Sequence, residues 1–208
     1  MYLLARQANL RGLDSQAWAV KIGAAAAEGL GNEVGVWATV LSPGFGTVTW
    51  TSRWADLVAL EKGFAEVSVN AKYLGLAAEG AAFVNGPIND TLYEVAYEGS
   101  SPIDDARYVG TVTAVCAPGH FARGIMGGLE IAQRAEKATG VSTSFLTGQT
   151  GAYGTVVWLA GYKDIAEFEK AQHALAADMS FIEYIDTATD AYQADPSLTQ
   201  STLYMRIS

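Results

Sequence analysis

The chain has 208 residues, half of them hydrophobic, which is enough to bury one large core or two small ones. Its 22 acidic and 13 basic residues give a net charge of −9, so we expect neither nucleic acid nor an anionic membrane surface as a partner. Cys116 is the only cysteine, which excludes an internal disulfide and a cysteine-based metal cluster and fits a reducing cytoplasm.

The first residues of the sequence do not have the pattern of a secretory leader, because a basic start, a long apolar core and a small-residue cleavage site are missing. The longest run of small apolar residues, at 22–31, is too short and too interrupted to span a bilayer. From the sequence we therefore expect a cytoplasmic protein.

The first half of the chain predicts four strands and two helices. In chain order these are a strand at 1–9, a helix from residue 14 or 15 to about 30, a hairpin that turns at 42–44, a helix from about 53, and a strand at 91–97. Gly31 closes the first helix, as a left-handed cap requires. The order β-α-β-β-α-β is typical of a ferredoxin-like unit.

The second half predicts the same order after a polar linker at 99–106. Its elements are a strand at 107–115, a helix at about 120–138, a hairpin that turns around 148–151, a helix from about 162, and a strand at 202–207. Gly140 closes the first of these helices, as Gly31 does in the first half.

A direct sequence repeat supports this division. The segment FGTVTWTSRWADLVALEK at 45–62 recurs without a gap as YGTVVWLAGYKDIAEFEK at 153–170. We therefore predict two units, at 1–98 and 107–208. A single unit leaves one face of its antiparallel sheet uncovered, which is unstable in water when that face is apolar. The predicted fold is α+β, with two tandem ferredoxin-like units that pair their sheets into an α+β barrel within one chain.

The alternation of side chains along the hairpin strands predicts which face of each sheet meets the helices. Val48 and Trp50 share one face, as do Val156 and Trp158 in the second copy, and we expect these faces to contact helices. The opposite face is expected to line the interior between the units and carries a mixed set of residues: Phe45, Thr47, Thr49, Thr51, Tyr153, Thr155, Val157 and Leu159.

The sequence GFGTVTWTSRWADLVAL, followed by Asn70, Tyr73 and FVNGPINDTLYEV, resembles the NIPSNAP-like branch of the dimeric α+β barrel superfamily. The resemblance covers most of residues 1–98 and, more weakly, 107–208. It implies the barrel fold. Relatives in that superfamily include cofactor-free monooxygenases, haem-degrading enzymes, chlorite-dismutase-like haem proteins, isomerases and ligand-sensing modules, so the fold implies no single function.

Few residues offer catalytic or metal-binding chemistry. The GFG at 44–46 precedes a strand, so it indicates a hairpin turn rather than a phosphate-binding loop, and no hydrolase signature is present. Cys116 is expected to be a small buried apolar residue. His120 and His173 have no further ligands at zinc-site spacing, so no metal site is predicted.

The resemblance bears on His173 in particular. It lies on the second helix of the second unit, where haem-binding relatives place an axial histidine. However, His173 is beside the apolar stripe of that helix, between Gln172 and Ala174, and no haem motif surrounds it. A surface histidine is the favoured interpretation, and no cofactor is predicted.

The resemblance also implies where a ligand would bind, because cofactor-free monooxygenases of the superfamily hold aromatic substrates between sheet and helices. The candidate ligand-binding residues are Asn9, Trp18, Trp37, Trp50 and Tyr73 in the first unit and Trp158 and His173 in the second. A tryptophan that recurs in both units is also explained by core packing. Arg6 and Glu94, on adjacent strands, predict an ion pair rather than an acid–base couple.

Three classes of function are compatible with these observations. The favoured one is a NIPSNAP-like protein that binds a small molecule or acts in assembly, without identifiable catalytic residues. The second is a cofactor-independent monooxygenase or isomerase that acts on an aromatic or polyketide-like compound, and the third is a haem protein. The expected partner is a small molecule; nucleic acid and membrane are not expected, and a homo-oligomer is compatible with the sequence.

Overall fold

The computed structural model of the protein describes residues 1–44, 46–101, 103, 105–195 and 197–208. Its strands are β1 (Tyr2–Asn9), β2 (Gly35–Val40), β3 (Thr47–Trp54), β4 (Asn89–Tyr97), β5 (Tyr108–Val115), β6 (Thr143–Gly148), β7 (Thr155–Tyr162) and β8 (Gln200–Arg206). Its α-helices are α1 (Gln16–Leu30), α2 (Leu57–Val67), α3 (Ala71–Phe83), α4 (Phe121–Thr139), α5 (Ile165–Ala177) and α6 (Met179–Ala188). Short 3₁₀ turns lie at Leu13–Ser15 and Thr189–Ala191.

In the described part of the chain, the eight strands form a closed barrel in the order β1-β3-β2-β8-β5-β7-β6-β4. The stretches β1-β3-β2 and β5-β7-β6 have the order that a ferredoxin-like unit gives its first three strands. The predicted fold, α+β with two such units that form a barrel within one chain, is confirmed.

The chain divides into two compact units. Unit 1 comprises Met1–Tyr93 and Met205–Ser208, and unit 2 comprises Glu94–Tyr204. This division falls within β4 and within β8, whereas the sequence analysis placed it in a linker at 99–106 and kept 107–208 whole. Two residues of that linker, 102 and 104, lie outside the described residues.

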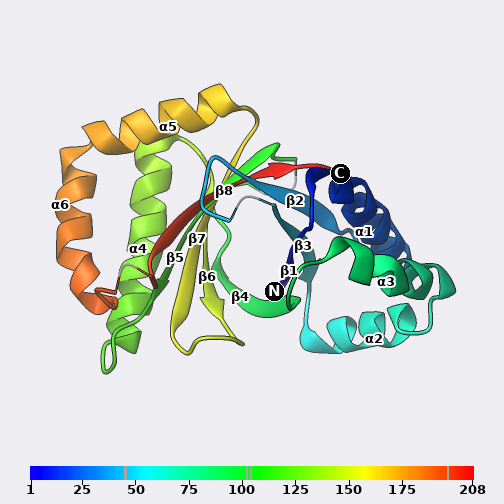
Figure 1. The fold of residues 1–208 in the computed structure, drawn as a ribbon. Helices are drawn as coiled ribbons and strands as arrows, with labels where there is room; N and C mark the ends of the chain where they lie inside the picture. The colour runs from blue at the N-terminus through cyan, green and yellow to red at the C-terminus, as the bar shows by residue number, and fades with distance from the viewer. Residues whose placement is uncertain (45, 102, 104, 196) are drawn as a thin grey trace. The chain divides into compact units, whose positions relative to one another are not determined.

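In unit 1, β1 and β2 pair with the two sides of β3 in antiparallel register, and α1, α2 and α3 lie on one face of these strands (Figure 1). Trp50 anchors α1 to this face, because its indole N–H donates to the Ala19 carbonyl oxygen at 2.9 Å. A Cβ atom at Gly23 would come to 2.5 Å from Val36, so glycine is what allows the close approach of α1. The predicted contact of Val48 and Trp50 with the helix is confirmed.

In unit 2, β5 and β6 pair with β7 in the same way, and α4 packs on the sheet. The Trp158 indole N–H donates to the Gly128 carbonyl oxygen of α4 at 2.8 Å. Gly128 has no space for a side chain, because an added Cβ would overlap the Phe145 ring. Trp158 and Val156 belong to the buried core, as the strand pattern predicted.

The second helix of each unit differs from the sequence prediction, which had one continuous helix. The structure breaks it into α2 and α3 at Asn70, and into α5 and α6 at Asp178. In each case the side chain accepts a hydrogen bond from the backbone N–H three residues later, at Tyr73 and Phe181. This contact is an N-terminal cap, and it begins a second helix where the sequence pattern predicted a single one.

The other face of the hairpin strands was predicted less well. Tyr153 is 88% exposed and stacks on Phe121 with ring centroids 5.7 Å apart, so its predicted place inside the barrel is wrong. The reason is that β7 begins at Thr155, two residues later. Phe45, the corresponding residue in unit 1, lies outside the described residues.

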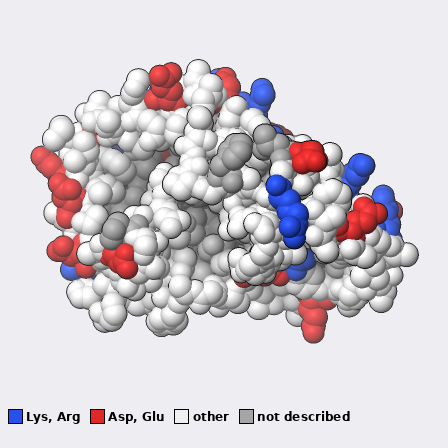
Figure 2. Space-filling model, in the orientation of Figure 1, with Lys and Arg blue, Asp and Glu red and all other residues white. Residues whose placement is uncertain are grey.

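On the face shown in Figure 2, the charged side chains are scattered over largely uncharged surface and do not form a large patch of one sign. None of the helices in the described ranges is long and apolar enough to cross a bilayer.

Candidate functional site

Unit 1 contains a cavity of about 450 Å³ between its sheet and its three helices. The strands contribute residues of β1 and β3, and the helices contribute residues along α1, α2 and α3, with the segment after α3 completing the wall. Most of the walls are aliphatic or aromatic: Leu4, Trp18, Ile22, Ala26, Leu30, Val34, Trp50, Phe64, Val67, Ala77, Ala81, Val84 and Ile88. We call this space the unit 1 cavity.

Two tryptophans form the aromatic part of the cavity. The rings of Trp18 and Trp50 meet edge to face, with centroids 6.1 Å apart, and Trp18 also stacks on Phe83 at 5.4 Å. The indole N–H of Trp18 donates to the Leu76 carbonyl oxygen at 3.0 Å, and that of Trp50 donates to Ala19. Since both polar atoms are already paired, the two rings offer the cavity apolar, polarisable surface.

Arg6 on β1 also lines the cavity, for a reason that lies in strand register. It is directly opposite Trp50 in the β1–β3 pair, and opposed residues project to the same face of a sheet. Its Nε and Nη2 donate to the two carboxylate oxygens of Asp90 at 2.8 and 2.6 Å. This paired contact with Asp90 raises the pKa of the Arg6 guanidinium, which therefore stays charged.

Tyr73 is positioned by its contacts with two elements. Its backbone N–H is capped by Asn70 at the start of α3, and its hydroxyl oxygen accepts from Nη1 of Arg6 at 3.1 Å. The hydroxyl proton has no acceptor within the described residues. Because Tyr73 lines the cavity, this hydroxyl is a hydrogen-bond donor in the cavity wall.

Arg11 is the second cationic residue of the lining. Its backbone N–H donates to the Phe83 carbonyl oxygen at 2.8 Å, which fixes the chain beside the end of α3. In the part of the chain that the structure describes, its guanidinium forms no ion pair, whereas Arg6 is neutralised by Asp90.

The structure brings together three of the candidate residues, Trp18, Trp50 and Tyr73, in the unit 1 cavity. Asn9 does not line it: its side-chain oxygen accepts from the Thr47 hydroxyl at 2.7 Å. Trp37 lies elsewhere as well, with its indole N–H donating to the Thr51 hydroxyl at 2.8 Å.

The two candidates in unit 2 do not form a site with these residues. Trp158 is buried in the core of unit 2, in contact with the rings of Phe145 and Tyr192. His173 is exposed on α5. A ligand-binding role for any of the seven candidates stays a prediction.

The sequence analysis missed the cavity roles of Arg6 and Arg11 and named the wrong partner for Arg6. The ion pair of Arg6 is with Asp90, while Glu94, four residues along β4, accepts from the Gln149 amide at 3.2 Å. The strand prediction did not fix the register of β4 against β1, and that register decides which acidic residue meets Arg6. The signal that was available is the alternation along β1, which places Arg6 on the same face as the apolar residues Leu4 and Ala8.

Unit 2 carries different residues at the positions equivalent to those of the cavity. Val112 is opposite Trp158 as Arg6 is opposite Trp50, and Phe181 follows the Asp178 cap as Tyr73 follows Asn70. Gly127 is equivalent to Trp18, because each precedes the residue whose carbonyl oxygen accepts from the strand tryptophan. Ala117 is equivalent to Arg11, because the two backbone N–H groups make matching hydrogen bonds. Ser201 is equivalent to Asp90, because each directly precedes the sequence TLY.

The interior of unit 2 is filled by its own aromatic side chains. The Tyr192 ring meets Trp158 edge to face at 5.5 Å, and its hydroxyl donates to the Gly124 carbonyl oxygen at 2.7 Å. Burial strongly raises the pKa of Tyr192, so this phenol stays protonated. Phe145 also packs against Trp158, with ring centroids 5.6 Å apart.

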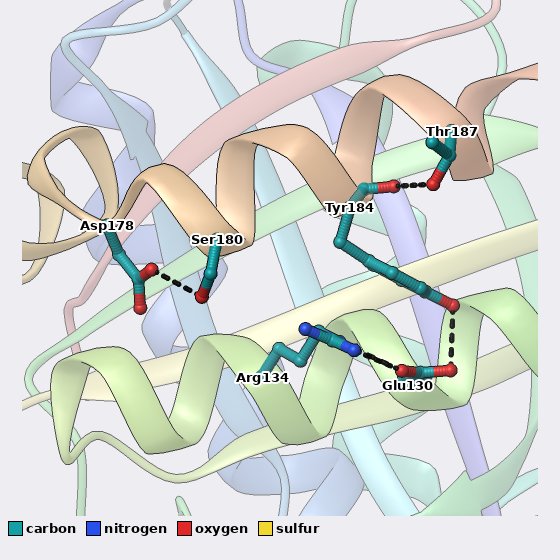
Figure 3. Close-up of polar contacts among 6 residues, drawn as sticks. All are labelled: Glu130, Arg134, Asp178, Ser180, Tyr184 and Thr187. Atoms are coloured by element: carbon teal, nitrogen blue, oxygen red, sulfur yellow. Dashed lines mark hydrogen bonds and ion pairs between the residues drawn. The ribbon is translucent and has the colours of Figure 1, made fainter.

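A second hollow, of about 530 Å³, lies on the surface of unit 2 beside α4 and α6. Figure 3 shows its polar contacts: Arg134 and Tyr184 both reach Glu130, and Arg134 donates to it at 2.6 Å. On α6, Asp178 accepts from the Ser180 hydroxyl at 2.8 Å, while the Thr187 hydroxyl donates to the Tyr184 carbonyl oxygen. Hydrogen bonds from Arg134 and Tyr184 lower the pKa of Glu130, so these charges compensate one another.

The unit 1 cavity offers binding groups rather than catalytic ones. Its described lining has two arginines and a tyrosine as ionisable groups, with no carboxylate, histidine or cysteine. Neither a guanidinium nor a protonated phenol accepts a proton at neutral pH. No group of three or more metal-ligating side chains occurs within the described residues.

No family model matches the sequence, and no curated protein matches it significantly. A candidate monooxygenase from Fusobacterium nucleatum has 12% identity and a TM-score of 0.71, over 100% of this chain and 92% of its own. An anthrone oxidase-like protein has 12% identity and a TM-score of 0.71, over 100% of this chain and 91% of its own. A NIPSNAP family protein from Agrobacterium tumefaciens has 17% identity and a TM-score of 0.38, over 44% of this chain and 89% of its own.

At these identities the two full-length matches show a shared fold and nothing about chemistry. The α+β barrel fold that the resemblance implied is confirmed.

Proposed function

We propose that unit 1 binds a small, planar, mainly apolar molecule in its cavity. The observation that carries this proposal is the cavity itself: about 450 Å³, walled by aliphatic and aromatic side chains, with a few oriented polar groups. Cavities of roughly 300–1,000 Å³ with this division of apolar and polar lining are the usual form of small-molecule sites. The edge-to-face pair of Trp18 and Trp50 favours an aromatic ligand.

Binding without catalysis is the better-supported form of this function. A reaction that begins with proton abstraction needs a base within hydrogen-bond reach of the ligand. The described lining offers donors, from Arg6, Arg11 and Tyr73, but no such base. The function proposed is therefore that of a carrier, sensor or assembly module that holds its ligand unchanged.

One observation favours oxygenation as a second candidate function. Tyr73 in the cavity lining has a hydroxyl that accepts from Arg6 and can itself donate, and such a donor stabilises an enolate, which forms readily from an acidic aromatic ketone. The name of one structural neighbour, anthrone oxidase-like, suggests a compound to test. Consumption of dissolved oxygen with anthrone, lost in Tyr73→Phe, would support catalysis; no consumption above the protein-free rate would leave binding alone.

We also propose the organisation that the sequence repeat implies: two units at 1–98 and 107–208, related by tandem duplication and joined by a linker at 99–106. What supports this is the gap-free recurrence of 45–62 at 153–170 and the same element order in both halves. The single cysteine supports a cytoplasmic location.

A fluorescent aromatic probe tests the binding function directly. N-phenyl-1-naphthylamine is uncharged and brightens in apolar surroundings. We expect it to bind the full chain and to be displaced when a larger side chain fills the cavity in Ala77→Phe. Ala78→Phe is the matched control, because Ala78 is the next residue of α3 and is exposed like Ala77, but does not line the cavity.

The result that supports the proposal is probe binding that is lost in Ala77→Phe and kept in Ala78→Phe. Equal binding by both variants, with both folded by circular dichroism, would place the probe elsewhere on the protein and reject the cavity as the site.

A further inference from the structure

We infer that the molecule held in the unit 1 cavity is an aromatic anion, with its negatively charged oxygen group at Arg11 and a second oxygen acceptor at Tyr73. The inference rests on the proposed binding function and adds to it the chemical class of the ligand. It comes from the sign of the charges at the cavity, the different pairing of the two arginines, and the direction of the free phenol proton.

The charged residues at the unit 1 cavity are opposite in sign to the net charge of the protein. The protein is acidic, with 22 acidic against 13 basic residues. Yet the charged residues of the described cavity lining are two arginines, Arg6 and Arg11. A cavity that selects cations or neutral compounds needs no arginine in its wall. Because acidic residues outnumber basic ones in this chain, an acidic lining residue would be expected from composition alone. The local charge is therefore opposite to that of the whole protein.

The two arginines of the lining differ in their ion pairing. Both carboxylate oxygens of Asp90 accept from Arg6, which leaves that pair close to neutral. The guanidinium of Arg11 has no such partner in the described ranges. The positive charge available to a ligand is therefore that of Arg11. Its planar array of donors fits a carboxylate or another compact oxygen anion.

The hydroxyl group of Tyr73 has a proton that it can donate. Because its oxygen already accepts from Arg6, the hydroxyl proton is directed away from that guanidinium and is free to be donated. A ligand carbonyl or phenolic oxygen in the cavity is a suitable acceptor. The Arg6–Asp90 pair thus has a positioning role: it holds the phenol of Tyr73, and the phenol contacts the ligand.

Unit 2 supplies an internal comparison for this set of residues. The equivalents of Arg6, Arg11, Tyr73 and Asp90 are Val112, Ala117, Phe181 and Ser201, so none of the four polar functions is present there. Trp50 does have an equivalent tryptophan, Trp158, in the core. The shared tryptophan is explained by the fold, whereas the four polar residues go with the cavity.

Two probes with the same aromatic body test the inference. N-phenyl-1-naphthylamine is uncharged, and 1-anilinonaphthalene-8-sulfonate adds one sulfonate to it. We expect the full chain to bind the sulfonate form more tightly. In Arg11→Gln its dissociation constant should rise about tenfold, the usual effect of losing one charge-assisted hydrogen bond, while that of the uncharged probe stays the same. Arg107→Gln, which removes the same charge from unit 2, is the control.

Tyr73→Phe gives the second readout. It removes only the hydroxyl, and it places in unit 1 the residue found at the equivalent position of unit 2. The inference predicts weaker binding of 9-oxo-fluorene-carboxylate, which has both a carboxylate and a ketone oxygen, with little change for 1-anilinonaphthalene-8-sulfonate, which has no ketone. An equal loss for both compounds would indicate a structural role for the hydroxyl and would overturn its assignment as a ligand donor.

The outcomes separate the inference from the function beneath it. If Ala77→Phe blocks the uncharged probe but Arg11→Gln leaves the sulfonate preference unchanged, the cavity binds ligands and the inference about the anion is wrong. If Ala77→Phe blocks neither probe, the proposed function fails, and the inference fails with it. A tenfold loss confined to the sulfonate probe and to Arg11→Gln supports both.

Discussion

The two units of this chain share an element order and a strand tryptophan that is bonded to a helix carbonyl, but they use the space around that tryptophan differently. In unit 1 the space beside Trp50 is a cavity of about 450 Å³ with Arg6, Arg11 and Tyr73 in its wall. In unit 2 the ring of Tyr192 packs against Trp158, and apolar residues replace the polar ones. The same scaffold therefore leaves a cavity beside the tryptophan in one copy and packs an aromatic ring there in the other.

The small residues of the first helix in each unit show how this difference is built. The strand tryptophan donates to Ala19 in unit 1 and to Gly128 in unit 2, so these two residues are equivalent. Ala19 is fully buried without a clash, whereas the Phe145 ring occupies the place of a side chain at Gly128. Unit 2 therefore packs a large aromatic ring against α4 where unit 1 has Val36.

Removing the Tyr192 ring should have the largest effect on the difference between the two units. Tyr192→Ala should lower the free energy of unfolding by about 3 kcal/mol, because it removes an aromatic side chain from a packed core. It should also open a second apolar site for N-phenyl-1-naphthylamine. Tyr192→Phe, which keeps the ring and loses the hydrogen bond to Gly124, should cost only about 1 kcal/mol. Urea unfolding measures both.

If Tyr192→Ala costs no more than Tyr192→Phe, the ring does not fill the interior of unit 2. The contrast between a filled and an open unit would then have to be abandoned.

A second variant gives unit 2 the alanine that unit 1 has at the equivalent position, Ala19. Gly128→Ala should lower the free energy of unfolding by about 2 kcal/mol, because the new methyl group overlaps the Phe145 ring. In the matched control Gly75→Ala, on α3, the new methyl group meets open space. That variant should be more stable by about 0.5–1 kcal/mol, since alanine favours the helix over glycine. A stabilising Gly128→Ala would show that unit 2 is not packed as described.

How much of this could be predicted from the sequence differs between fold and site. The strand pattern and the glycines that close α1 and α4 are local signals, and they placed Trp50 and Trp158 on the helix side of each sheet. The breaks at Asn70 and Asp178 were also local, since each is a capping residue inside an apolar stripe, but the stripe concealed them.

The site depended on information that one sequence does not contain. The partner of Arg6 is decided by the register of β4, so Glu94 was as plausible from the sequence as Asp90. The grouping of Trp18, Trp50 and Tyr73 followed from the family resemblance, but the same argument also named Asn9 and Trp37, which lie outside the cavity. Arg6, Trp18 and Tyr73 come from three different elements and line one cavity, and only the folded chain shows that.

The number of aromatic probe molecules bound per chain shows whether one unit or both are open to a ligand. Unit 1 should bind and unit 2 should not, so a fluorescence titration of the full chain with N-phenyl-1-naphthylamine, at protein concentrations well above the dissociation constant, should saturate at one probe per chain and fall to zero in Ala77→Phe. Two probes per chain, or one that persists in Ala77→Phe, would contradict the account.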